Sequence, residues 1–125
     1  MSSPDHILAI DQGTSATKAV LVDAAEKLRG DGVGARVLNM PFVDPLDEAT
    51  LLEAARETRG IVTVEEATVT GGLGAAVASL VAQHEPTAMR ILGITGFAPT
   101  GSASYLLDHF GLTADGIAAA AHELA

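Results

Sequence analysis

The feature that most constrains the fold is the regular alternation of short apolar segments with longer segments of helical periodicity. Runs rich in Ile, Val and Leu have the length and composition of buried strands. They occupy residues 7–10, 35–40, 61–64 and 90–94. Helical patterns follow at residues 14–29, 48–58, 71–85, 102–110 and after residue 113. Strands that alternate with helices predict a mainly parallel sheet of four or five strands in a three-layer α/β/α fold.

The spacing of apolar residues predicts the faces that these helices bury. Ala16, Val20, Ala24 and Leu28 lie four residues apart, so they would share one face of a helix over residues 14–29. The third helix is expected to bury Ala76, Val77, Leu80 and Val81. Three side chains are positioned to cap the N-termini of later helices, namely Asp47, Ser102 and Thr113.

Composition limits the classes of function. A chain of 125 residues fits one domain over residues 1–125. Seven Lys and Arg against sixteen Asp and Glu give a net charge of −9, which disfavours nucleic acid and anionic membranes as partners. The absence of Cys rules out thiolate metal sites. With no signal peptide or spanning segment in the sequence, we expect a cytoplasmic protein.

Glu65 and Glu66 follow the third predicted strand and are the first candidates for chemistry. One of them could act as a general acid or base. Adjacent residues of a strand point to opposite faces, however, so the two cannot form a paired carboxylate site. The favoured interpretation is therefore structural, with one carboxylate accepting hydrogen bonds from backbone N–H groups of the glycine loop or the helix start.

The glycine-rich turn before the third helix is a weak candidate for an anion site. Gly71, Gly72 and Gly74 could present N–H groups to an anion at a helix N-terminus. The turn lacks the G-x-G-x-x-G spacing and has no following Lys-Ser/Thr, so it is neither a dinucleotide fingerprint nor a P-loop. Close packing of the helix start is the simpler explanation for these glycines.

The remaining polar residues predict no catalytic residue and no metal site. The histidines form no H-x-H or H-x-x-x-H pair, and no thiolate accompanies them. No serine lies in a G-x-S-x-G setting.

From about residue 24 to residue 125 the sequence resembles the C-terminal domain of transketolases. The strongest match is a strand ending in Glu-Glu, followed by a Gly-Gly-Leu-Gly turn that opens a helix. The matching stretches are AAEKLRGDGVGARVLNM, PLDEATLLEAA, IVTVEEATVTGGLGAAVASLVA and ITGFAPTGSASYLLDHFGLTADGI. Ala67 departs from the family, which usually has His or Asn there, so any polar contact of that position is not carried over.

A second resemblance covers residues 7–23. The segment ILAIDQGTSATKAVLVD is similar to the first phosphate motif of the FGGY sugar kinases, a β-hairpin near Mg²⁺ and ATP phosphates. That resemblance would assign nucleotide contacts to Asp11, Gly13, Thr14 and Lys18. In a transketolase-type domain, Asp11 would instead end the first strand and accept a hydrogen bond from the turn or face solvent. A helix over residues 14–29 favours the transketolase interpretation and a hairpin favours the kinase one.

The transketolase resemblance implies a domain that does not itself catalyse. In that family, thiamine diphosphate and Mg²⁺ lie between two other domains, which also supply the catalytic residues. No cofactor is therefore expected in this chain. Its expected partners are the thiamine-binding domains or subunit, and copies of itself. The complete enzyme would transfer two-carbon ketol units between sugar phosphates. The alternatives are a nucleotide-binding sugar-kinase fragment and a free-standing module that binds an anionic metabolite at the glycine turn.

Overall fold

The computed structural model describes residues 6–11, 15–40, 45–96 and 100–125. The elements follow the predicted order, strand and helix in alternation with two helices at the end. They are β1 (Ile7–Asp11), α1 (Ser15–Gly30), β2 (Ala35–Asn39), α2 (Glu48–Arg56), β3 (Gly60–Thr68), α3 (Leu73–His84), β4 (Ala88–Ile94), α4 (Ala103–His109) and α5 (Ala114–His122).

The four strands form one sheet in the order β2-β1-β3-β4, and every neighbouring pair is parallel. The chain leaves β1 toward β2 on one side and returns to the other side of β1 for β3. The strand order therefore reverses between β1 and β3. In parallel sheets, ligands gather beyond the carboxyl ends of the strands at such a reversal. The predicted three-layer α/β/α fold is confirmed.

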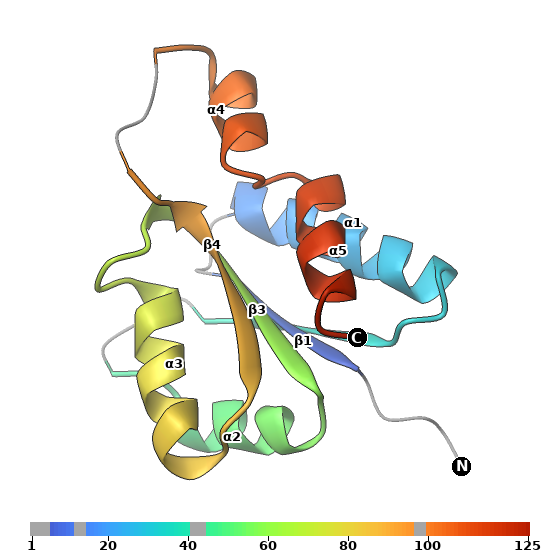
Figure 1. The fold of residues 1–125 in the computed structure, drawn as a ribbon, viewed down its shortest axis with the longest axis vertical. Coiled ribbons are helices and arrows are strands. Elements are labelled where there is room, and N and C mark those ends of the chain that lie inside the picture. Colours follow the sequence, from blue (N-terminus) through green and yellow to red (C-terminus); the bar gives the residue numbers. More distant parts are fainter. Residues whose placement is uncertain (1–5, 12–14, 41–44, 97–99) are drawn as a thin grey trace.

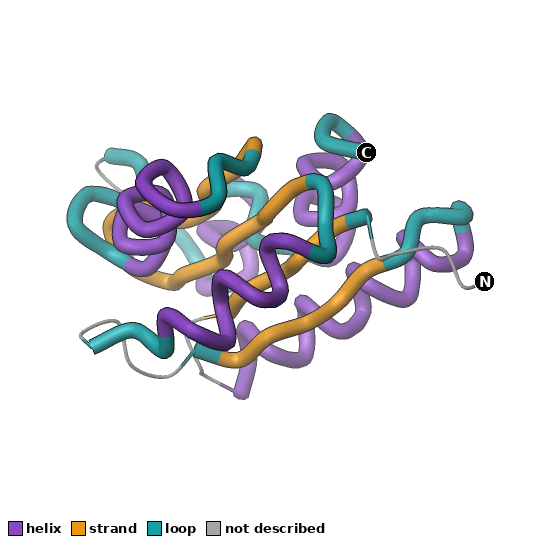
Figure 2. The backbone as a smooth tube through the Cα atoms, turned by 90° about the horizontal axis from the view of Figure 1, so that it is seen from below, coloured by secondary structure: helices purple, strands orange, loops and turns teal. Residues whose placement is uncertain are grey.

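Helices cover both faces of this sheet (Figure 1). In the view turned by 90°, Figure 2 shows purple helices on both sides of the orange strands. The first core cluster lies on the α1 and α5 face, and the second core cluster lies on the α2 and α3 face. Buried members of the first cluster include Ile7, Ala9, Leu21, Leu28, Val62 and Ile117. Those of the second include Leu8, Ile10, Leu51, Ile61, Val77 and Leu80.

The three predicted N-caps are confirmed. Asp47 Oδ1 accepts from Thr50 N at 3.3 Å, and Ser102 Oγ accepts from Tyr105 N at 3.1 Å. Thr113 Oγ1 accepts from Gly116 N at 3.1 Å. Each contact satisfies one of the N–H groups that the first turn of a helix leaves without a partner.

The buried face of α1 is broader than the predicted one, although Ala24 and Leu28 are buried as predicted. Its buried residues are Thr17, Leu21, Ala24, Ala25 and Leu28, while Val20 is only half-buried. The side chain of Ala16 lies outside the described residues. The face is broad because α1 packs against both the sheet and α5. Residues spaced four apart form only one narrow row on a helix, so they account for part of this face.

Most element boundaries lie within two residues of the prediction, and the ends of α2 and β3 differ for reasons that the structure shows. Helix α2 ends at Arg56 and not at Thr58, because the Thr58 hydroxyl donates to the Ala54 carbonyl at 3.2 Å and competes with the helical hydrogen bond. Strand β3 continues past Val64 as far as Thr68, because Thr68 pairs with Ile94 of β4 beyond an irregularity in the register.

None of the helices in the described ranges combines the length and the apolar composition needed to cross a membrane.

Candidate functional site at the carboxyl edge of the sheet

The reversal in strand order brings together the ends of β1 and β3 and the start of α3. Asp11, the last residue of β1, pairs in register with Val64, and Glu65 follows directly. Both acidic side chains are fully buried. This edge is where a ligand of such a fold would be sought first.

Glu65 is bonded to the backbone of its own chain. Its Oε1 accepts from Leu73 N at 3.0 Å, and its Oε2 accepts from Gly74 N at 3.0 Å. The carboxylate therefore satisfies two N–H groups of the first turn of α3 and places negative charge at the positive end of the helix dipole. The structural interpretation of the glutamate pair is confirmed for Glu65.

Strand alternation explains this arrangement. Ile61, Thr63 and Glu65 lie two residues apart, and Ile61 belongs to the second core cluster beneath α3. The neighbouring Glu66 is exposed, as expected for a residue that points the other way. The two carboxylates thus have separate environments and cannot act as a catalytic pair.

Thr63 lies beneath the first turn of α3 without a hydrogen bond. It is fully buried, and its hydroxyl has no hydrogen-bond partner among the residues that the structure describes. A Cβ added at Gly74 would lie 2.7 Å from Thr63 Oγ1. The same Cβ would lie 2.3 Å from Ile91 Cγ2, so only glycine lets the helix start approach β3 and β4 this closely.

The weak anion site predicted at Gly71, Gly72 and Gly74 has its nearest donors already engaged. Gly71 has a φ of +73° and forms the turn, and Gly72 precedes α3 without a side-chain cap. The N–H groups of Leu73 and Gly74 point to Glu65. An external anion would have to displace this buried carboxylate, and binding there stays a prediction.

The candidates from the sugar-kinase resemblance are not all within the described structure. Asp11 is fully buried, so the alternative in which it faces solvent was wrong. The turn that would donate a hydrogen bond to it, residues 12–14, lies outside the described residues. Lys18 is exposed on α1, while Gly13 and Thr14 lie outside the described residues. The hairpin that this resemblance implies is not formed, since Ser15–Gly30 is a helix.

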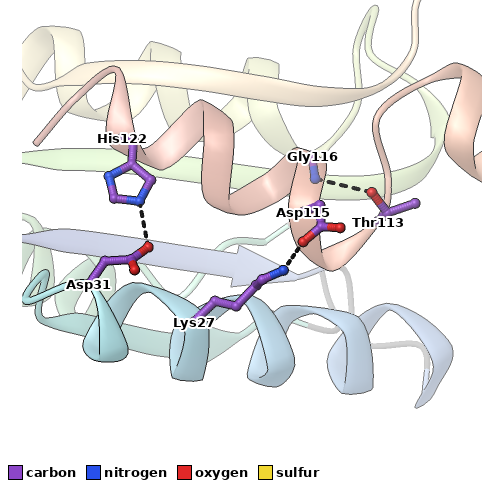
Figure 3. A network of polar contacts seen from close by, with 6 residues as sticks. All are labelled: Lys27, Asp31, Thr113, Asp115, Gly116 and His122. Atoms are coloured by element: carbon purple, nitrogen blue, oxygen red, sulfur yellow. Dashed lines mark hydrogen bonds and ion pairs between the residues drawn. The ribbon is translucent and has the colours of Figure 1, made fainter.

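Polar contacts of α5 with α1 and with Asp31, the residue after α1, were not expected from the sequence (Figure 3). Lys27 Nζ contacts Asp115 Oδ1, and His122 Nε2 lies 3.0 Å from Asp31 Oδ2. The partners are 88 and 91 residues apart along the chain, so no local pattern could have paired them. All four side chains are substantially exposed, and such pairs contribute about 0–1 kcal/mol each.

The described residues also hold no group of three or more His, Cys, Asp or Glu side chains placed to bind a metal ion. The chain is thus a parallel, three-layer α/β domain in which Glu65 caps the N-terminus of α3 at the carboxyl edge. It belongs to a known family, because the model of "Transketolase, C-terminal domain" matches residues 12–117.

Individual relatives agree with this family. The chain is 45% identical over 102 residues to a 6-deoxy-6-sulfo-D-fructose transketolase subunit from Clostridium sp. (strain MSTE9), covering 81% of this chain and 32% of the relative. It is 42% identical over 105 residues to a 1-deoxy-D-xylulose-5-phosphate synthase from Heliobacterium modesticaldum, covering 82% and 16%.

A solved structure extends the likeness to nearly the whole chain. It is described as a split gene transketolase, inactive beta4 tetramer, and it matches with a TM-score of 0.88 and 32% identity. The match covers 98% of this chain and 40% of that one. This chain thus spans about a third or less of the length of the two curated relatives above.

Proposed function

We propose that this chain is the C-terminal domain of a transketolase-type enzyme, or a small subunit made of that domain, and that it serves packing and assembly. Residues 1–125 would form one such domain. The observation that carries this proposal is the Glu65 contact with Leu73 N and Gly74 N. In many parallel α/β domains, a helix N-terminus at this edge binds a phosphate group. Here the Glu65 carboxylate of the chain itself occupies that position.

The names of the relatives support a role that is independent of substrate. One is named for a transketolase of a sulfonated deoxy sugar and another for a synthase of 1-deoxy-D-xylulose 5-phosphate. Both match this chain over about four fifths of its length. A domain shared by proteins that act on different sugars is better suited to holding an enzyme together than to selecting its substrate.

The chemistry of the proposed enzyme lies outside the described residues. Thiamine diphosphate and Mg²⁺ would be held by other domains, which would carry out two-carbon ketol transfer between sugar phosphates. The described part of this chain is a poor fit for either group, because it offers no carboxylate cluster for Mg²⁺ and its α3 N-terminus is filled by Glu65. The proposed partners are the thiamine-binding domains and, as in the tetrameric relative, copies of this chain.

A domain exchange tests this proposal. The matching 102-residue segment of the Clostridium subunit would be replaced by the corresponding part of this chain, and the hybrid assembled with the rest of that enzyme. We expect kcat/KM for the original sugar to stay within about tenfold, or about 1.4 kcal/mol, because the exchanged part only packs. The control is the same subunit cut before the segment, which should lose activity. A hybrid that folds and assembles but changes its sugar preference would contradict the proposal.

A further inference from the structure

Strand β4 is an open edge of the sheet. Among the described residues, β4 pairs with no strand other than β3, and it lies at the outer side of the sheet in Figure 1. One further backbone contact joins Ile94 O to Val69 N at 3.0 Å, just beyond the end of β3. Residues of a parallel strand direct their N–H and C=O groups alternately to the two sides. About half of the backbone groups of β4 therefore point away from β3, and such a row is a template for another strand.

This edge has few of the features that keep edge strands from pairing, although its register with β3 is irregular before Ile94 and Met89 O accepts from Arg90 Nη1 at 2.9 Å. β4 has seven residues and β2, the other edge, has five. β4 contains no Pro or Lys, and its apolar side chains are only partly covered, namely Met89, Ile91, Leu92 and Ile94. Its single charge, Arg90, is engaged by Glu123, with Nε donating to Oε2 at 2.7 Å. Charged side chains, Pro and bulges on the open side are the usual protection.

The charge distribution favours a second copy of this chain as the occupant. The chain carries a net charge of −9, so two copies repel each other in general. The flank formed by α3 and β4 is an exception, because α3 contains no Asp, Glu, Lys or Arg and Arg90 is paired. A basic partner would instead match carboxylates elsewhere, such as Asp47, Glu48 and Glu53 around α2.

We propose that two copies of this chain pair along β4, antiparallel and related by a two-fold axis, so that their sheets join into one. With the axis at Ile91, that residue faces its own copy, Arg90 faces Leu92 and Met89 faces Gly93. No like charges then lie directly opposite, an arrangement that would be destabilising. This inference rests on the proposed assembly role and adds the surface that performs it.

Two measurements on the unmodified chain test the pairing. Sedimentation equilibrium should show a reversible dimer. Amide hydrogen exchange should be measured across the concentrations at which the dimer forms. Residues 88–94 should exchange more slowly as the fraction of dimer rises. Strand β2 is an internal control, because residues 35–39 form the other edge and should exchange at a rate independent of concentration.

A matched pair of variants tests the same surface. Leu92 of β4 and Val37 of β2 are both half-buried, lie on edge strands and pack against the first core cluster. Leu92→Lys puts two like charges into the proposed interface, so we expect the dimer dissociation constant to rise by at least about tenfold. Val37→Lys should change it by less than about twofold, as for a surface change outside the interface. Circular dichroism would establish that both variants fold.

The outcomes separate this inference from the proposed function. A chain that stays monomeric at every concentration, or a dimer that protects β2 and not β4, would overturn the β4 pairing. So would a folded Leu92→Lys chain that still dimerises as well as the original. A chain that stays monomeric would also remove copies of itself from the proposed partners. None of these results would affect the domain exchange, which requires contact with the thiamine-binding part and not with a second copy. Failure of the domain exchange, conversely, would leave the concentration-dependent protection of β4 intact.

Discussion

At the scale of single residues, the two adjacent glutamates show how strand direction decides a role. Glu65 is fully buried and accepts two backbone hydrogen bonds from the start of α3. Glu66 is exposed on the opposite side of the strand. Their identical chemistry makes them a matched pair, since the only difference between them is what each side chain contacts.

Replacement of these glutamates by glutamine should separate the two roles. Gln keeps the shape of Glu65 but has one oxygen only, so one of the two N–H groups loses its acceptor. We expect Glu65→Gln to lower the free energy of unfolding by about 1–3 kcal/mol, because a buried donor is left unsatisfied. Glu66→Gln should change it by less than about 0.5 kcal/mol. Urea unfolding of both variants measures the difference, and equal effects would mean that the Glu65 contact does not stabilise the chain.

Gly74 is a position at which a single added methyl group should destabilise the fold. An added Cβ would lie 2.3 Å from Ile91 Cγ2, so the first turn of α3 would have to move away from the sheet. We expect Gly74→Ala to destabilise the chain by about 1–3 kcal/mol, as other overpacked sites do. Gly30→Ala is the control, since nothing lies within 4 Å of its added Cβ and it ends α1.

The control substitution at Gly30 has an expected direction of its own. Alanine has the higher helix propensity, so Gly30→Ala should be neutral or stabilising by up to about 1 kcal/mol. Thermal unfolding of both glycine variants would show the contrast. A tolerated Gly74→Ala would indicate that the start of α3 can shift without loss.

At the scale of elements, the sequence identified the order of strands and helices and three caps, because these depend on short-range signals. Asp47, for example, lies three residues from the N–H group that it caps. Leu21 and Ala25 of α1 were missed because α5 packs against this helix from the far end of the chain. The extension of β3 was missed because Thr68 is held by pairing with Ile94, which no local pattern reveals.

The features of the candidate site also separate into those that local sequence predicts and those that it does not. The contact of Glu65 with α3 was predictable, since its partners are only eight and nine residues away and a glycine turn joins them. The burial of Asp11 was not, because it depends on how β1 packs between β2 and β3, which lie far from it along the chain. Local sequence therefore predicts a helix cap well and the burial of a strand-end carboxylate poorly.

Helix α3 offers a test of how firmly one element is held. Leu80 is 6% exposed and belongs to the second core cluster, while its neighbour Ser79 is exposed. Leu80→Ala should lower the free energy of unfolding by about 2–5 kcal/mol through lost burial and the cavity left behind. Ser79→Ala should change it by less than about 0.5 kcal/mol. A loss below about 0.5 kcal/mol for Leu80→Ala in urea would show that this face of α3 contributes little.

At the scale of the whole molecule, we expect the isolated chain to have no transketolase activity. Titration of thiamine diphosphate with Mg²⁺ should give no binding tighter than about 1 mM, which corresponds to about −4 kcal/mol. The reason is that the described residues offer no carboxylate cluster and the α3 N-terminus is occupied by Glu65. Isothermal calorimetry measures this directly. Stoichiometric, Mg²⁺-dependent binding would require a cofactor site within these 125 residues.

The two faces of the sheet differ in when they can be completed during synthesis. The buried members of the second core cluster all lie between Leu8 and Val81. The first core cluster also needs Ile117, Ala118 and Ala121 of α5. A ribosome adds about 5–20 residues per second and releases the N-terminal part first. In a nascent chain, the second core cluster, under α2 and α3, can therefore be buried before α5 has been synthesised. The first core cluster is still incomplete at that stage, so a chaperone would bind the exposed apolar residues on the α1 face.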